Sequence, residues 1–268
     1  MELFELEMLG EGVERRYRKQ RPEVDEMPWG TFDTGHFSQP ALVAARKAWT
    51  SAAFQEHRTG IACAATLRAL YECRAPIDLI ALAARFPMDE LVHIELCARM
   101  AMELGGGTEI QHDPDALIVD PSDRLPPLLR AADMVVRFFC VGEALSIPLL
   151  KGTWHAAKHP LPRAILGRIV RDEAAHGTFG FTFLDWALPS LSERDRYHLA
   201  RAAEGPIRAI RRQWDEMRKR RVEGYDPSAG DALGWMQTDA YLSLASQCMQ
   251  SRVVGPLRAR GILVGASS

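Results

Sequence analysis

Two stretches of the chain place a histidine three residues after a glutamate, a spacing that can bind a metal ion. Glu90 and His93 form one pair, and Glu173 and His176 form the other. Residues three apart lie on the same face of a helix, so both side chains of a pair can reach one ion. A carboxylate-bridged dinuclear site in a helical bundle needs two such pairs and one lone Glu from each of two further helices. The sequence must therefore also supply two isolated carboxylates.

Two isolated glutamates meet this requirement. Glu56 is the only acidic residue between positions 34 and 71, and Glu143 is the only one between positions 134 and 171. Both lie among small and apolar residues, where a solvated surface charge is not expected. Burying a carboxylate in such surroundings costs several kcal/mol unless it is paired, protonated or bound to a metal. We therefore expect both residues to be metal ligands.

The positions of these glutamates relative to two predicted turns support the same interpretation. The midpoint between Glu56 and Glu90 is residue 73, next to the predicted turn at 73–76. The midpoint between Glu143 and Glu173 is residue 158, at the predicted turn at 158–162. Each antiparallel helical pair would rise ~25 Å from its turn, at about 1.5 Å per residue, and bring its two glutamates to the same height. The sequence therefore predicts one site shared by two helical hairpins.

A third Glu-x-x-His spacing, Glu109 and His112, is interpreted as a coincidence. It lies between a run of three glycines and an Asp-Pro pair, where no helix is expected. The other two copies lie within predicted helices, so the sequence surroundings separate them from the third.

Hydrophobic periodicity predicts that the elements carrying these residues are all helices. We expect a bend at Pro148, and a kink or a division of the second main helix at Pro87. Glycines 105–107 should end that second helix, and residues 105–125 form a connection long enough to cross the bundle. The predicted helices cover about 41–73, 78–104, 126–157, 163–188, 193–221 and 231–254.

No stretch shows the alternation typical of strands, so the fold class is all-α, without a sharp second-domain boundary. We interpret residues 1–39 as an N-terminal arm and 40–188 as the bundle. Residues 189–268 are expected to be C-terminal helices packed on the bundle within the same domain.

Composition limits the classes of partner. The chain has 268 residues, of which 47% are hydrophobic and 25% charged, and its net charge is −2. This charge gives no reason to expect nucleic acid or an anionic membrane as a partner. Five scattered cysteines without a Cys-x-x-Cys pair indicate reduced thiols, and no apolar run approaches the ~20 residues that span a bilayer. The acidic start lacks the layout of a signal peptide, so we expect a cytoplasmic protein.

The six residues Glu56, Glu90, His93, Glu143, Glu173 and His176 resemble the ligand pattern of the ferritin-like di-iron carboxylate superfamily. The resemblance covers about residues 40–188. It implies a four-helix bundle with a long crossover between its second and third helices; the additional C-terminal helices lie outside the resemblance. It also implies bridging roles for Glu90 and Glu173, and a role for Asp89 and Asp172 as acids that accept the Nδ1–H of a ligand histidine.

The resemblance implies two iron ions, with manganese at one or both positions as an alternative, and O2 as co-substrate. We expect an oxygenase or oxidase that acts on a small, partly apolar organic substrate; the alternative is a ferroxidase or a rubrerythrin-like protein handling iron or peroxide. The arylamine N-oxygenases of this superfamily have an additional His one turn before the last Glu, where this chain has Ile169. The electron donor and the reaction outcome are left open, as is a homodimer.

Small and apolar residues next to the predicted ligands have two interpretations. They can leave a substrate cavity beside the metals, or they can serve tight helix packing. These residues are Gly60, Cys63, Cys97, Cys140 and Ile169.

Overall fold

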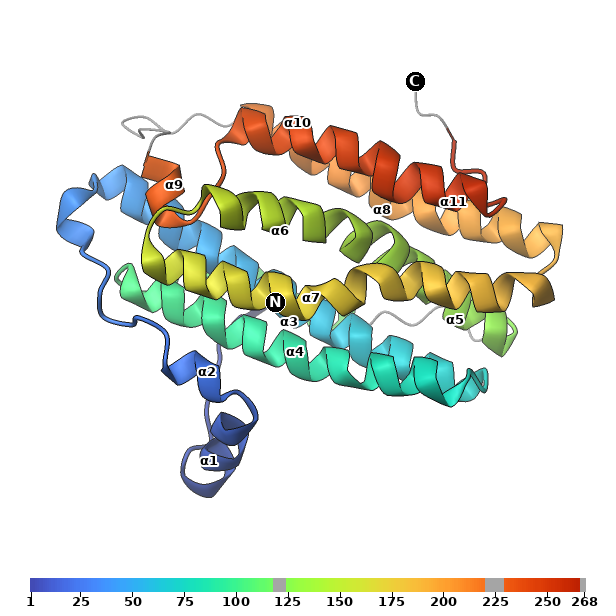
Figure 1. Ribbon diagram of the computed structural model, residues 1–268, viewed down its shortest axis with the longest axis horizontal. Coiled ribbons are helices and arrows are strands. Elements are labelled where there is room, and N and C mark those ends of the chain that lie inside the picture. Colours follow the sequence, from blue (N-terminus) through green and yellow to red (C-terminus); the bar gives the residue numbers. More distant parts are fainter. Residues whose placement is uncertain (118–123, 220–228, 266–268) are drawn as a thin grey trace.

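A computed structural model gives the structure of the protein and describes residues 1–117, 124–219 and 229–265. Helices dominate the described residues, which confirms the predicted all-α class (Figure 1). The central helices are α3 (Gln39–Glu72), α4 (Ile77–Glu103), α5 (Pro127–Val135), α6 (Ala144–Ala156) and α7 (Pro160–Ala187). The others are α1 (Glu11–Gln20), α2 (Pro22–Asp25), α8 (Glu193–Lys219), α9 (Ala229–Leu233), α10 (Thr238–Cys248) and α11 (Gly255–Ala259).

Short segments complete the described chain. Two-residue strands β1 (Glu2–Leu3) and β2 (Gln111–His112) pair antiparallel, a feature that the helical pattern did not predict. The 3-10 segments are η1 (Thr34–His36), η2 (Asp115–Leu117) and η4 (Leu188–Ser190), and the π-helical segments are η3 (Val136–Glu143) and η5 (Met249–Val254). Residues 118–123 of the predicted crossover lie outside the described residues.

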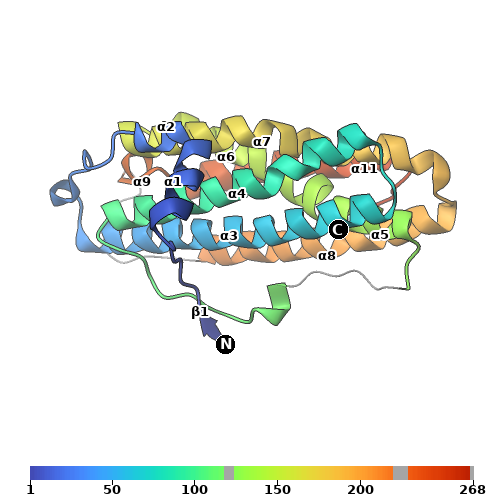
Figure 2. The ribbon, with the colours of Figure 1, turned by 90° about the horizontal axis from the view of Figure 1, so that it is seen from below.

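Two helical hairpins form the centre of the fold (Figures 1 and 2). Helix α3 packs along α4 in one hairpin, and α6 packs along α7 in the other. The hairpins join through contacts of α3 with α5 and of α4 with α7. The turns between paired helices fall at residues 73–76 and 157–159, close to their predicted places. The four long helical segments therefore surround a common interior.

The helix ends follow from local sequence. The Ser38 side chain accepts a hydrogen bond from the backbone N–H of Ala41 and caps α3, whereas Gly105 ends α4 with a φ of 103°. Ser192 and Asp195 hydrogen-bond reciprocally at the start of α8, as expected for an N-capping Ser. Helix α4 continues through Pro87 without being divided, so of the two predicted alternatives, a kink or a division, the division is wrong.

The main irregularity of the third bundle segment is a π-helical stretch. Segment η3 begins at Val136 and ends at Glu143, between α5 and α6, whereas Pro148 lies inside the continuous helix α6. A π-turn inserts one residue and so rotates the following side chains by ~100° relative to a regular helix. The insertion thus sets the direction in which the side chain at position 143 points.

The apolar core consists of two clusters, and the helices pass from one to the other. Helix α3 contributes Ala53 to one cluster and Cys63 to the other, and α7 contributes Ile169 and Phe179 in the same way. The predicted ligands Glu56, Glu173 and His176 lie between these apolar positions along the helices. A polar layer therefore separates two apolar regions of the core.

Further helices pack on this core. Helix α8 contacts η3, and α10 contacts α6. The predicted helix at 231–254 is interrupted: α9 ends at Leu233, and α10 begins at Thr238 after Gly234 adopts a φ of 89°. Thus the C-terminal segment covers the side of the second hairpin that carries η3 and α6.

A buried ion pair anchors the N-terminal arm to the helical bundle. The Arg21 guanidinium contacts the Glu95 carboxylate of α4 at 2.8 Å, and 1% of Arg21 is exposed. Asp25 accepts a second hydrogen bond from Arg21 at 2.6 Å. The arm is thereby joined to the helix that carries Glu90 and His93.

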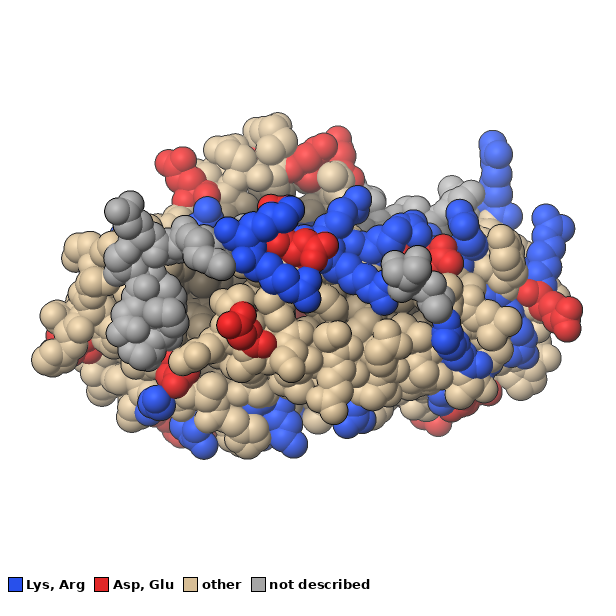
Figure 3. Space-filling view, turned by 90° about the horizontal axis from the view of Figure 1, so that it is seen from above, with Lys and Arg blue, Asp and Glu red and all other residues tan. Residues whose placement is uncertain are grey.

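The surface shows one concentration of basic residues. Figure 3 shows a band of Lys and Arg side chains on the face formed by the C-terminal helices, with acidic side chains within it. On α8, the Glu204 carboxylate pairs with both Arg201 and Arg208, at 3.6 and 3.4 Å. These ion pairs neutralise part of the basic charge. Within the described ranges, no helix combines the length and the apolar character that a bilayer span requires.

Candidate metal centre

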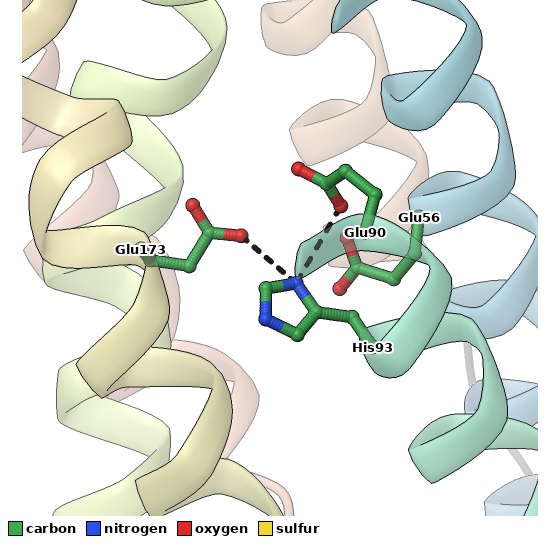
Figure 4. A group of neighbouring side chains, drawn as sticks. All are labelled: Glu56, Glu90, His93 and Glu173. Atoms are coloured by element: carbon green, nitrogen blue, oxygen red, sulfur yellow. Dashed lines mark ion pairs between the residues drawn. The ribbon is translucent and has the colours of Figure 1, made fainter. Parts of the chain in front are cut away.

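The structure brings all six predicted ligand residues together in two overlapping groups. Within each group, one ligand atom per residue lies within 4.8 Å of the others. One group is Glu56, Glu90, His93 and Glu173, drawn in Figure 4, and the other is Glu90, Glu143, Glu173 and His176. Glu90 and Glu173 belong to both groups. This arrangement can hold two metal ions with two shared carboxylates.

The two histidines approach the shared carboxylates through the same ring nitrogen. The Nδ1 atom of His93 lies 3.3 Å from Glu173 Oε1 and 3.5 Å from Glu90 Oε2. The Nδ1 atom of His176 lies 3.0 Å from Glu173 Oε2 and 3.3 Å from Glu90 Oε1. Atoms that bind one ion at about 2.0–2.2 Å are separated by such distances. The Nδ1 atoms are therefore the ones directed at the candidate metal positions.

The outer nitrogens of the same rings contact the two predicted acids, and they do so across the bundle. His93 Nε2 of α4 lies 3.3 Å from Asp172 of α7, and His176 Nε2 of α7 lies 3.5 Å from Asp89 of α4. The expectation that these acids accept the Nδ1–H is wrong, because Nδ1 faces the glutamates. An Asp beside Nε2 favours the tautomer with a proton there and leaves the Nδ1 lone pair free for a metal. We refer to these two contacts as the crossed Asp–His pairs.

Two arginines that sequence reasoning missed hold these aspartates. Arg85 Nε lies 3.0 Å from Asp89 Oδ2, and Arg168 Nε lies 3.0 Å from Asp172 Oδ2. Each Arg precedes its Asp by four residues, so both helices carry the spacing Arg-x-x-x-Asp-Glu-x-x-His. A side chain four residues earlier lies on the same helical face. The repetition of this longer motif was the signal that could have identified the arginines.

Burial and mutual repulsion control the protonation of the ion-free residues. Burial raises the pKa of Glu56 well above its usual range, and repulsion from Glu90 adds to this effect. The pKa of Glu143 is raised for the same reasons, with Glu173 as its main neighbour. Burial alone would lower the pKa of His93, but its contacts with Asp172 and with the shared glutamates raise it well above the usual value. Protons therefore replace part of the positive charge that ions would supply.

The pKa values of Glu173 and His176 also reflect a balance between burial and neighbouring charges. Burial alone would raise the pKa of Glu173, but its close contacts with His176 and His93 lower it below its ordinary value. Burial opposes charge on His176 as well, yet contacts with Asp89 and Glu173 raise its pKa to about 12.

Unsatisfied polar atoms indicate that the residues fit a pair of metal ions. Both carboxylate oxygens of Glu90 are buried without a hydrogen-bond partner among the described residues, as are the Nδ1 atoms of His93 and His176. Buried polar atoms normally have partners, so this concentration requires an explanation. The four glutamates carry a formal charge of −4 that two divalent ions would balance. Mixed imidazole and carboxylate donors suit iron, manganese and zinc better than calcium or magnesium.

Two of the predicted cavity residues serve close helix packing. A Cβ atom at Gly60 would lie 3.3 Å from the Cβ of Glu90, so this glycine allows α3 to approach a shared ligand. Cys140 packs against Gly180, whose added Cβ would lie 2.8 Å from the Cys140 sulfur. Asp185 and Arg260 are the charged residues that act on the Cys140 thiol. These contacts favour the packing interpretation for Gly60 and Cys140.

The other three residues are Cys63, Cys97 and Ile169, which are buried in the apolar clusters. Burial and the negative charge of Glu90 raise the pKa of the Cys63 thiol, and burial and Glu56 do the same for Cys97. Ile169 is buried in the same apolar cluster as Cys97. These residues therefore form apolar walls at the two sides of the polar layer.

One phenylalanine contacts a candidate ligand, whereas the third Glu-x-x-His copy lies outside both ligand groups within the described residues. The Phe86 ring lies 4.1 Å from the ring of His176, centroid to centroid, and was not identified from the sequence. His112 of the third copy lies in β2, where its ring contacts Phe4 and Phe54. Glu109 and His112 do not belong to either group of candidate ligands within the described part of the chain.

Comparison with protein-family models, curated proteins and solved structures returned no significant match to this chain.

Proposed function

We propose that this chain is a ferritin-like di-iron protein that uses O2 to oxidise a small organic substrate. The observation that supports this proposal is the pair of overlapping ligand groups sharing Glu90 and Glu173. Two iron ions bound there would supply the electron transfer and the activation of O2. Manganese at one or both positions is compatible with the same ligands.

The protein's own residues orient the ligands. Asp172 accepts a hydrogen bond from the Nε2–H of His93, and Asp89 lies 3.5 Å from Nε2 of His176, so each acid favours a proton on Nε2 and leaves the Nδ1 lone pair directed at the site. Arg85 and Arg168 pair with those aspartates and fix their positions. The apolar clusters on either side exclude bulk water, so competing reactions with solvent are suppressed.

Burial favours a resident cofactor over iron in transit. Glu90, His93, Glu143, Glu173 and His176 are all buried, and Glu56 is partly buried. A ferroxidase must pass iron through its site during turnover, whereas an oxygenase retains it. The apolar walls at Cys63, Cys97 and Ile169 also suit an organic substrate with an apolar portion. The fold does not choose among these chemistries, so the choice depends on the surroundings of the site.

Anaerobic titration with Fe(II), followed by O2, tests the proposal. We expect saturation at about two irons per chain, as two ligand groups require, and rapid O2 consumption without release or mineralisation of the iron. Replacing Glu173 and His93 together with Ala should abolish saturable binding, because each ligand group loses at least one donor. Circular dichroism checks that this double variant remains folded.

The third Glu-x-x-His copy provides the matched control. The double variant Glu109→Ala/His112→Ala removes the same residue types and should bind iron as the unmodified protein does. Equal iron binding by the Glu173/His93 variant would refute the site. Continued conversion of added Fe(II) into a ferric mineral would instead establish the ferroxidase function.

A further inference from the structure

A groove outside the metal centre runs between α6 and α7 and is bordered by the N-terminal arm. Its volume is about 840 Å³, which is within the range of pockets that hold small organic molecules. Ile147 of α6 and Val170 of α7 contribute apolar surface, and Met27 contributes it from the arm. The groove therefore offers an apolar floor to part of a ligand.

The charged residues around this groove are predominantly basic. The basic residues are Lys151, Arg163, Arg168 and Arg171, and the acidic ones are Glu23 and Glu26. Lys151 is exposed and makes no ion pair with a described residue. The Arg163 guanidinium lies over the Trp154 ring, 5.6 Å from its centroid. This imbalance of charge favours an anionic ligand.

A carboxylate of the protein already occupies part of the groove. Glu23 Oε2 lies 3.1 Å from Arg171 Nη2 and 3.5 Å from Arg168 Nη1. Two guanidinium groups thus converge on one carboxylate oxygen, and contacts between guanidinium and carboxylate groups are among the stronger polar contacts in proteins. Arg171 and Glu23 are largely exposed, with 64% and 56% of their side chains accessible, so their ion pair contributes little to stability and can be exchanged.

The geometry points to a binding site in this groove for a small organic carboxylate with an apolar body. We propose that its carboxylate takes the place of Glu23 between Arg168 and Arg171, and its apolar part lies along Ile147, Val170 and Met27. The arm residue Glu23 thereby acts as an internal competitor. This site is separate from the metal ligands, and its occupation does not require the proposed oxidase activity.

One groove residue connects this site to the metal centre. Arg168 is mostly buried, and its Nε contacts the Asp172 oxygen that also lies 3.3 Å from His93 Nε2. Its Nη1 atom faces Glu23 in the groove. A ligand that engages Arg168 is therefore separated from His93 by two residues, Arg168 and Asp172.

Calorimetric titration of the protein as purified with 1-naphthylacetate tests the site. The matched neutral probe is 2-(1-naphthyl)ethanol, which has the same ring system without the charge. We expect saturable binding of the carboxylate at one site per chain and much weaker binding of the alcohol. Higher salt should weaken binding of the carboxylate only, because exposed charges are screened.

Substitutions of two exposed residues should have opposite effects on binding of the carboxylate. Glu23→Gln removes the competitor and should tighten binding by roughly threefold, whereas Arg171→Gln should weaken it by roughly fivefold, as expected for partly exposed ion pairs. Arg201→Gln on α8 is the control and should leave binding unchanged. The proposal is overturned if 1-naphthylacetate binds neither the unmodified protein nor Glu23→Gln. It is also overturned if Arg171→Gln binds the carboxylate as tightly as the unmodified protein does, or if the carboxylate and the alcohol bind equally well. Because the readout is ligand binding, its failure is distinct from a failure of iron binding.

Discussion

Single side chains set the orientation of each candidate ligand, and Asp172 is the clearest example. It contacts both His93 and Arg168 from a buried position. Asp172→Asn keeps the shape of the side chain and removes its charge. We expect metal affinity to fall by roughly 10- to 100-fold, the usual effect of changing a residue that orients a ligand.

Titration of Asp172→Asn with Co(II), followed by visible absorption, measures this effect. The control is Asp185→Asn on the same helix, an exposed carboxylate paired with Arg260 at 2.7 Å, for which affinity should not change. Equal affinity of Asp172→Asn and the unmodified protein would show that the acid does not position His93.

The protonation of the two candidate ligand histidines predicts how metal affinity depends on pH. The pKa of His93 and of His176 is raised, the latter to about 12, so both rings carry an extra proton at neutral pH when no ion is bound. A metal ion can bind Nδ1 only after displacing that proton. Affinity should therefore rise with pH, and binding should release protons. Calorimetry at pH 7 in buffers of different ionisation enthalpy measures the release; an absence of released protons would contradict this prediction.

The sequence predicted which residues gather at the candidate metal centre, but not the atoms and contacts that they use. Glu56 and Glu143 could be identified because an isolated acid in an apolar helix is conspicuous. The crossed Asp–His pairs could not, since they depend on how α4 and α7 face each other across the bundle. Arg85 and Arg168 could have been found from their regular spacing before Asp89 and Asp172.

At the level of elements, hairpin geometry was predictable and helix irregularity was not. The turn positions followed from the symmetry of the glutamates about residues 73 and 158. The π-helical stretch η3 was missed because a shift of one backbone hydrogen bond leaves little trace in hydrophobic periodicity. Pro148, which was expected to bend this segment, lies within α6.

Close packing of α7 against η3 predicts a large effect of one methyl group. A Cβ at Gly180 would lie 2.8 Å from Phe139 Cβ and 2.9 Å from the backbone nitrogen of Cys140. Because a backbone atom cannot move aside easily, Gly180→Ala should destabilise the protein by about 1–3 kcal/mol. Urea denaturation measures the change.

Helix α8 supplies the matched control for this substitution. Gly205 is also helical, and an added Cβ there would meet nothing within 4 Å. Gly205→Ala should stabilise the protein by up to about 1 kcal/mol, through helix propensity alone. If both substitutions change stability equally, the proposed contact between α7 and η3 is not tight.

At the scale of the whole molecule, the buried pair Arg21–Glu95 joins the arm to the bundle. Arg21→Met leaves Glu95 buried and without its nearest cation, so the free energy of unfolding should fall by about 3 kcal/mol. The additional change Glu95→Leu should recover most of this loss, because no buried charge then remains. Urea denaturation of the two variants distinguishes a charge effect from lost packing; equal stability of both would indicate packing alone.

The crossed Asp–His pairs also bear on how the two metal positions would fill. Helix α4 carries the histidine of one position and the acid that orients the histidine of the other, and α7 does the same in reverse. A first ion that draws α4 and α7 into register would therefore prepare the second position as well. Loading would then be cooperative, and chains with a single ion would be scarce.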